Sequence, residues 1–268
     1  MMQRQLRYSS HHFGPLNQNP QHNLAKSHAL NIYRKNAIYS FIPKNACSTM
    51  RASIARANGC IKNEDDLHWI HQNNQTFIAD LGDLIRAEYT FVILRCPFAR
   101  LASVYLDKIV SKTDMVAHDI QRLTKWSIDT EEMSFSEFVA LMEKPGIRAT
   151  NRHWRPQVDF LVYEEYDDYF CLEDFSSAET ILKQKIDLDI MDARRITQHG
   201  IAHLNKVTDS DFSNKSAHEI NILKREGVVP AITTLYDDKS IETVAKLYKN
   251  DIDIYTDKFG TEMLSFDI

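Results

Sequence analysis

Residues 37–59 read AIYSFIPKNACSTMRASIARANG, and this stretch decides the fold. Its first part, Ala37–Ile42, is a compact run of β-prone residues, which predicts a strand. Pro43 follows, and a proline cannot continue a central strand because it has no N–H to donate. Ser48 or Thr49 then predicts the N-cap of a helix, which ends at the Asn-Gly pair closing the stretch. The sequence thus predicts a strand, a short loop and a helix, in that order.

A second strand-and-helix unit begins at Tyr89–Arg95, which reads YTFVILR. Its continuous apolar centre is typical of a strand covered on both faces, and Pro97 suits the first turn of the helix that follows. Two short strands are predicted at Phe160–Tyr163 and Tyr169–Leu172, and an amphipathic helix at Lys239–Tyr255. Strands that alternate with helices in this way predict an α/β fold with a central, mostly parallel sheet flanked by helices.

The composition excludes several classes of protein. The chain has 268 residues, a formal net charge of −5 and 43% hydrophobic residues. A disordered chain would be poorer in apolar residues, and the acidic balance disfavours a general nucleic-acid binder. The chain holds 7 glycines, and neither GxGxxG nor GxxxxGK[ST] is present, which excludes the dinucleotide-binding and Walker-type phosphate loops.

The polar start of the chain predicts its organisation. Residues 1–30 have no apolar core, which predicts a polar, mobile N-terminal arm followed by a single domain over residues 31–268. There is no secretory signal pattern, and no run of about 18 apolar residues that could span a membrane. The cysteines form no CxxC pair. These features predict a cytoplasmic protein with free thiols and no membrane span.

The loop that begins at Lys44 has the composition of an anion site. A tight turn from a strand into a helix points several backbone N–H groups at one spot, and the helix dipole adds partial positive charge there. The hydroxyls of Ser48 and Thr49 and the mobile cation of Lys44 complete a cradle for a phosphate or a sulfate. The alternative is that Ser48 or Thr49 merely caps its own helix.

Arg95 stands at the carboxyl end of the second predicted strand. Ligands of open α/β sheets bind beyond these strand ends, so we expect Arg95 and the Lys44 loop to share one crevice. A guanidinium is suited to bidentate capture of a phosphate, and Ser103 lies in the helix that follows. The alternatives are a salt bridge at a strand end for Arg95 and an ordinary helix position for Ser103.

These segments resemble the sulfotransferases that use 3′-phosphoadenosine 5′-phosphosulfate (PAPS), in particular the carbohydrate branch related to the Golgi enzymes. The PK-x-x-x-[ST] loop of that family is matched by residues 43–49, and its R-x-P-x-x-R-L-x-S-x-Y motif by residues 95–105. Three weaker matches follow in the same order: HWRPQ at 153–157, H-x-N-K at 203–206 and an LY…D…FG ending at 247–260. The resemblance covers residues 37–260.

The resemblance implies a P-loop-like three-layer fold and a metal-independent enzyme. Such an enzyme moves the sulfuryl group of PAPS to an acceptor hydroxyl, here on a carbohydrate, and releases 3′,5′-ADP (PAP). It also implies that Arg95 and Ser103 hold the 3′-phosphate, with Lys44 beside the scissile S–O bond. The 5′-phosphosulfate would be held by Lys44, Asn45, Ala46, Cys47, Ser48, Thr49 and Arg51.

The resemblance further implies a base that accepts the proton of the acceptor hydroxyl. Relatives use a histidine or a carboxylate between the two motifs; His68 matches best, and His71 is the second candidate. An imidazole titrates near neutral pH and suits this task, although both rings could simply face solvent. His153, Trp154 and Arg155 are candidate acceptor contacts, because an aromatic ring and a guanidinium suit a sugar and its acidic groups. Core packing is the alternative for Trp154.

Two other functions stay open: a nucleotide kinase with an atypical phosphate loop, and a non-catalytic nucleotide-binding protein. Kinase loops are Gly-rich, place a lysine directly before the Ser or Thr, and need an Asp for magnesium, whereas Lys44 precedes Ser48 by four positions. A non-catalytic protein is expected to lack Lys44 or the candidate base. Eukaryotic relatives carry a membrane anchor and paired cysteines; we expect neither here, which predicts a bacterial, cytoplasmic version.

Overall fold

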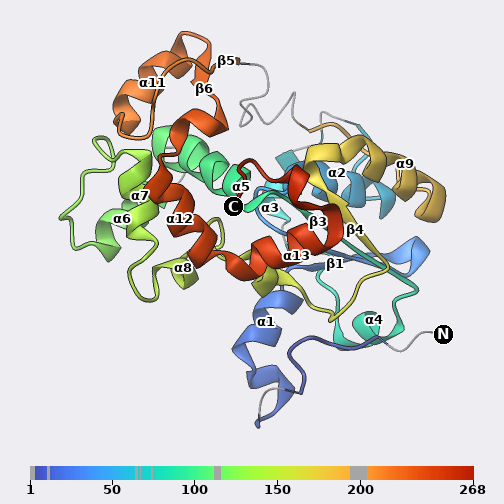
Figure 1. The fold of residues 1–268 in the computed structure, drawn as a ribbon. Helices are drawn as coiled ribbons and strands as arrows, with labels where there is room; N and C mark the ends of the chain where they lie inside the picture. The colour runs from blue at the N-terminus through green and yellow to red at the C-terminus, as the bar shows by residue number, and fades with distance from the viewer. Residues whose placement is uncertain are drawn as a thin grey trace. The chain divides into compact units, whose positions relative to one another are not determined.

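The computed structural model describes residues 4–10, 13–63, 66, 68–73, 75–111, 116–193 and 204–268 (Figure 1). The chain divides into two compact units. The first comprises Met1–Arg95 and Gln157–Gln198, and the second comprises Cys96–Pro156 and His199–Ile268. The chain therefore passes into the second unit directly after Arg95 and returns to the first at Gln157.

A four-stranded sheet forms the centre of the first unit. Its strands lie in the order β1 (Ala29–Ile32), β2 (Ala37–Ser40), β3 (Tyr89–Leu94) and β4 (Asp168–Cys171). β1 is antiparallel to β2, whereas β2, β3 and β4 are parallel. The predicted α/β fold with a mostly parallel central sheet is thus confirmed. Since parallel neighbours end at the same edge, the carboxyl ends of β2 and β3 lie side by side.

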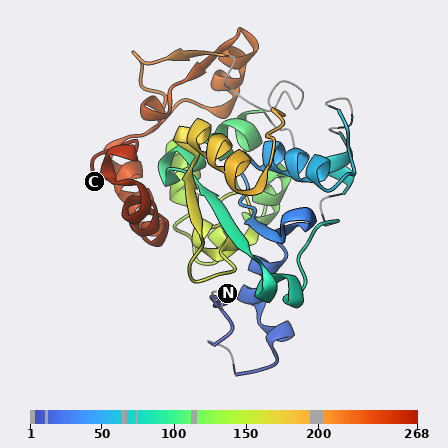
Figure 2. The same cartoon turned by 90° about the vertical axis from the view of Figure 1, so that its right-hand side faces the viewer.

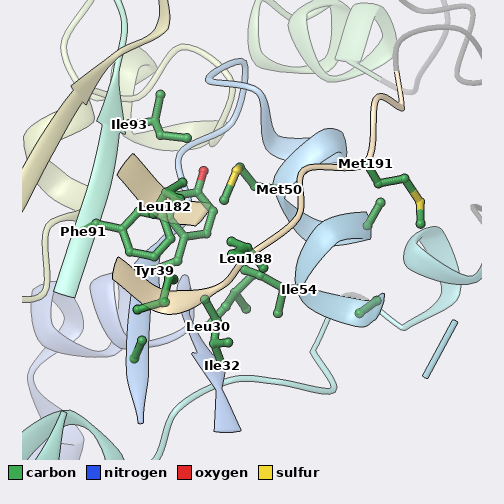
Figure 3. Close-up of a cluster of buried hydrophobic side chains, with 14 of the residues drawn as sticks. Leu30, Ile32, Tyr39, Met50, Ile54, Phe91, Ile93, Leu182, Leu188 and Met191 are labelled. Carbon is green, nitrogen blue, oxygen red and sulfur yellow. The ribbon is translucent and has the colours of Figure 1, made fainter. Parts of the chain in front are cut away.

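Helices α2 (Cys47–Ala57) and α9 (Phe175–Ile186) pack on one face of this sheet. The ring centroids of Tyr39 on β2 and Phe91 on β3 lie 5.1 Å apart, in a stacked arrangement, and both rings are fully buried (Figure 3). Met50 and Ile54 stand four positions apart in α2 and so lie on the same face of the helix, turned to this core. All residues of β2 and β3 are buried, as the apolar run in β3 predicts.

The start of the chain is part of the packed first unit. Within the predicted arm of residues 1–30, Pro20–Lys26 form α1, and Ala29 begins β1. Ala25 has no exposed surface. Arg4 also forms an ion pair of 2.7 Å with Asp167, next to β4. These contacts could not be inferred from the polar composition of the arm. A single domain over residues 31–268 stays a prediction.

The first unit also contains several short helical elements. They are η1 (Leu16–Gln18), η2 (Tyr33–Lys35), α3 (Trp69–Gln72), α4 (Leu81–Arg86), η5 (Gln157–Phe160) and η6 (Leu172–Asp174). The predicted strand at Phe160–Tyr163 is wrong: η5 ends at Phe160, and Tyr163 makes only an isolated bridge, to Leu6. A lone bridge partner offers no ladder along which a strand could form.

The second unit is mainly helical. Its helices are α5 (Pro97–Val104), the π-helix η4 (Tyr105–Val110), α6 (Val116–Leu123), α7 (Phe135–Leu141), α8 (Ile147–Thr150), α11 (Ala217–Arg225), η7 (Ile232–Leu235), α12 (Asp238–Leu247), α13 (Lys249–Phe259) and η8 (Thr261–Met263). A small parallel pair, β5 (Asn205–Val207) and β6 (Val228–Pro230), lies beside α11 (Figures 1 and 2).

The predicted continuous helix over Lys239–Tyr255 is wrong at Tyr248. At this residue the backbone leaves the helical region, with φ −113° and ψ 27°, and separates α12 from α13. The Tyr248 hydroxyl donates a hydrogen bond of 2.6 Å to the carbonyl oxygen of Trp154. A buried tyrosine needs such a partner for its hydroxyl. The amphipathic pattern continues across the break because both helices bury an apolar face.

Candidate active site

The loop between β2 and α2 adopts a backbone conformation that is unusual for its residues. Lys44 has φ 75° and Ala46 has φ 52°, both in the left-handed region. Residues with a side chain rarely take this conformation, which costs on the order of 1–3 kcal/mol each. The helix begins at Cys47, so the predicted N-cap at Ser48 or Thr49 is wrong; Ala46 occupies the capping position. Both hydroxyl residues therefore lie inside the first turn.

The N-terminus of α2 presents unpaired backbone donors. The first backbone bond of the helix runs from the N–H of Met50 to the carbonyl of Ala46, at 2.9 Å. The N–H groups of residues 47–49 therefore have no acceptor within the helix, and no side chain caps this end. Donors at a helix N-terminus, together with left-handed residues before it, form an anion-binding arrangement.

The left-handed conformation at position 46 leads to a stability prediction. We expect Ala46→Gly to raise the free energy of unfolding by about 0.5–1 kcal/mol, because glycine takes this conformation without steric cost although it loses more chain entropy. Ala52→Gly in the interior of α2 is the matched control, and it should lower the free energy of unfolding by about 1 kcal/mol or more. Urea denaturation of both variants measures the change in the free energy of unfolding. A decrease in this free energy for both variants would contradict a left-handed conformation at Ala46.

The structure brings the Lys44 loop and Arg95 together. Arg95 follows β3, and its guanidinium Nη1 donates a hydrogen bond of 3.0 Å to the carbonyl oxygen of Lys44. The side chain of Asn45 donates to the carbonyl of Ile93 on β3, at 2.8 Å, and to the side chain of Gln157, at 2.6 Å. The two segments that the sequence singled out therefore meet at the carboxyl ends of β2 and β3, as expected for an α/β sheet.

Arg51 connects α2 with the segment that contains the candidate bases. Its guanidinium donates to the carbonyl oxygen of Ile70 in α3 and lies over the ring of Phe41, 5.7 Å from the centroid. His68 directly precedes α3 and His71 lies within it, and both histidines are exposed. The structure therefore links α2 to the histidine segment through Arg51.

In the second unit, Ser103 lies in α5 and is partly exposed. Arg100, in the same helix, is 2% exposed and donates 2.8 Å and 3.4 Å hydrogen bonds to the carbonyl oxygens of Arg155 and Arg152. This buried guanidinium thus holds the turn at residues 151–155. The sequence had placed Arg100 in the phosphate-binding motif by resemblance, with no signal for this contact.

The predicted acceptor contacts His153, Trp154 and Arg155 lie together in this turn. Trp154 is fully buried, and its indole N–H donates to the carbonyl of Ile147 at 2.9 Å, which matches the core-packing alternative. His153 and Arg155 are both partly exposed. His153 pairs with the side chain of Asn151 at 2.8 Å. The indole therefore anchors a turn whose two polar neighbours reach the surface.

One motif match includes a residue outside the described part of the chain, and other expectations concern a metal site, a membrane span and the cysteines. His203, in the H-x-N-K match, lies outside the described residues. Across the described chain there is no cluster of three or more His, Cys, Asp or Glu side chains placed to hold a metal ion. None of the described helices is both long and apolar enough to cross a membrane. All four cysteines are free thiols.

The chain is similar to a known protein family and to a carbohydrate sulfotransferase. The sulfotransferase family matches residues 28–256. Carbohydrate sulfotransferase 14 of Danio rerio is 26% identical over 134 residues, which cover 44% of this chain and 36% of the relative. The match thus spans about a third of that protein's length. No solved structure matches this chain.

Proposed function

Because the chain belongs to the sulfotransferase family, we propose that it transfers the sulfuryl group of PAPS to an acceptor hydroxyl on a carbohydrate. One observation carries the proposal: the left-handed loop at Lys44, the free N–H groups of residues 47–49 and the guanidinium of Arg95 converge at the ends of β2 and β3. This is a set of donors and cations suited to a phosphosulfate. The relative named above supports a carbohydrate acceptor.

We assign each group a role from its chemistry. The N–H groups at the start of α2, with Ser48 and Thr49, bind the 5′-phosphosulfate oxygens, and Arg95 and Ser103 bind the 3′-phosphate. When bound, PAPS supplies an activated sulfuryl group. Lys44 neutralises the charge that develops on the phosphate oxygen as the S–O bond breaks. Fixed donors of this kind need no reorganisation as the reaction proceeds.

The acceptor side of the site requires a proton acceptor and a binding surface. His68 accepts the proton of the acceptor hydroxyl while the hydroxyl oxygen forms the new bond to sulfur. PAP leaves with the bridging oxygen. His71 is the second candidate for this base. His153 and Arg155 offer a hydrogen-bonding ring and a cation to acidic or hydroxyl groups of the sugar. Metal independence and a cytoplasmic location stay predictions.

The nucleotide product offers a direct test of the proposal. We expect 3′,5′-ADP at about 100 times its dissociation constant to raise the melting temperature by roughly 5–10 °C, since ligand binding to the folded state alone adds about 2.7 kcal/mol of stability. Differential scanning fluorimetry measures the shift, with ATP and magnesium as the comparison. A kinase would respond to ATP with magnesium instead. The absence of a shift with millimolar 3′,5′-ADP would refute the sulfotransferase proposal.

A further inference from the structure

The side chain of Gln157 occupies a position that the reaction chemistry does not explain. We infer that Gln157 is a positioning residue, which holds the phosphosulfate loop at the end of β3 in its binding-competent conformation. This inference rests on the proposed function. The sequence carries no signal for this role, because Gln157 is there only the last residue of the HWRPQ match.

The Gln157 amide is buried, with 1% exposure, and each of its polar atoms is used. Its Oε1 accepts a hydrogen bond of 3.0 Å from the backbone N–H of Arg95, and its Nε2 donates one of 2.9 Å to the carbonyl of the same residue. The amide thus pairs with both backbone groups of Arg95, as a neighbouring strand would. Oε1 also accepts a bond of 2.6 Å from Asn45 Nδ2.

Asn45 is the loop residue that this contact anchors. It has no exposed surface and stands between the two left-handed residues, Lys44 and Ala46. Its amide nitrogen donates to both Ile93 and Gln157, whereas its Oδ1 accepts from no donor among the described residues. The anchoring of this buried side chain therefore depends on the donor side of its amide alone.

The hydrogen bonds form a closed circuit. Gln157 binds Asn45 and Arg95, and the Arg95 guanidinium returns to the carbonyl of Lys44, the residue before Asn45. The circuit joins the two segments that supply the cations of the site. A strained loop relaxes when its anchor is lost, because only the surrounding contacts maintain its conformation. Gln157 therefore sets the relative position of Lys44 and Arg95 without touching the substrate.

Gln157→Glu provides a pH-dependent test. The ionised carboxylate keeps both acceptor contacts but cannot donate to the carbonyl of Arg95, whereas the protonated form can donate as the amide does. We expect 3′,5′-ADP to bind at least about tenfold more weakly than to the wild type at pH 8, as for the loss of one buried hydrogen bond. Because the variant regains its donor on protonation, the ratio of the two dissociation constants should fall toward one as the pH is lowered from about 6 to about 4, the range in which a glutamic acid side chain takes up its proton. Calorimetric titration measures both constants.

Two further variants separate positioning from general stability. Gln157→Met keeps the side-chain volume but removes every polar contact, and it should weaken 3′,5′-ADP binding at all pH values. Tyr166→Phe is the matched control: its buried hydroxyl bonds Ser40, at the end of β2, and Val162, and it makes no hydrogen bond to Lys44, Asn45 or Arg95. It should lower the melting temperature and leave the dissociation constant unchanged.

The outcomes decide between the inference and its alternatives. Three results would each overturn the positioning role. They are unchanged 3′,5′-ADP binding in Gln157→Met, equally weakened binding in Tyr166→Phe, and no pH-dependent recovery of binding in Gln157→Glu. Amide hydrogen exchange of residues 45–50 gives a readout that needs no nucleotide, and faster exchange in Gln157→Met than in Tyr166→Phe is expected. If the wild type fails to bind 3′,5′-ADP, the proposed function fails, whereas the exchange experiment still tests the anchoring of the loop.

Discussion

Lys44→Ala is expected to lower kcat for sulfuryl transfer by at least about 10²–10³-fold, the loss typical when one preorganised charge or donor is removed from a developing anion. The variant should fold normally. The Lys44 contact that orders the loop is made by its backbone carbonyl, which accepts from Arg95, and alanine keeps that carbonyl. A radiolabelled PAPS assay measures turnover, and the melting temperature reports the integrity of the fold.

Two variants control this experiment. Lys35→Ala removes an exposed lysine near the amino end of the same strand, β2, and should leave turnover unchanged. Lys44→Arg retains the charge with a different shape and hydration, so we expect partial activity. Turnover of Lys44→Ala within a few-fold of the wild type would remove Lys44 from its catalytic role, provided that Lys35→Ala is equally active.

His68→Ala is expected to lower the rate by about 10²–10⁴-fold, the usual contribution of a positioned general base. Measurement of kcat with saturating PAPS tests the size of the loss, and the melting temperature of the variant reports the integrity of its fold.

His71→Ala is the matched comparison, since both histidines are exposed and belong to the same short helix: His68 directly precedes α3 and His71 lies within it. We expect His71→Ala to remain within a few-fold of the wild type. A large loss in His71→Ala with an unchanged His68→Ala would transfer the role to His71. If neither variant changes the rate, the base is a carboxylate elsewhere in the site.

The local elements of the first unit followed from the sequence because local signals are strong there. The β-prone run before Pro43 and the apolar run YTFVILR became β2 and β3. In the second unit, Pro97 begins α5, as its sequence position predicts. By contrast, β1 was missed since ALNI follows a polar segment and is defined by its pairing with β2. The break at Tyr248 was also missed, because the amphipathic pattern continues across it.

In the site, too, some features followed from the sequence and others only from the structure. The sequence identified Lys44 and Arg95 because charges at strand ends carry a chemical meaning that needs no coordinates. The left-handed conformation of Ala46 carried no such signal, since glycine is the usual residue there. Trp154 was placed with the acceptor contacts, but its indole is buried. A tryptophan in a short motif has the same letter whether its ring faces a ligand or the core.

The sequence by itself indicated the type of fold, because periodicity and proline positions act over a few neighbouring residues, and its motifs resemble those of the family that the comparison shows. It also offered Lys44 and Arg95 as the candidate cations of the site. The tertiary structure decided how these groups are held. Gln157 meets Asn45 across 112 positions and Arg95 across 62. Such contacts form only when the parallel strands are paired in register and the polar side chains are buried away from water. Those conditions arise only when the whole sheet is assembled.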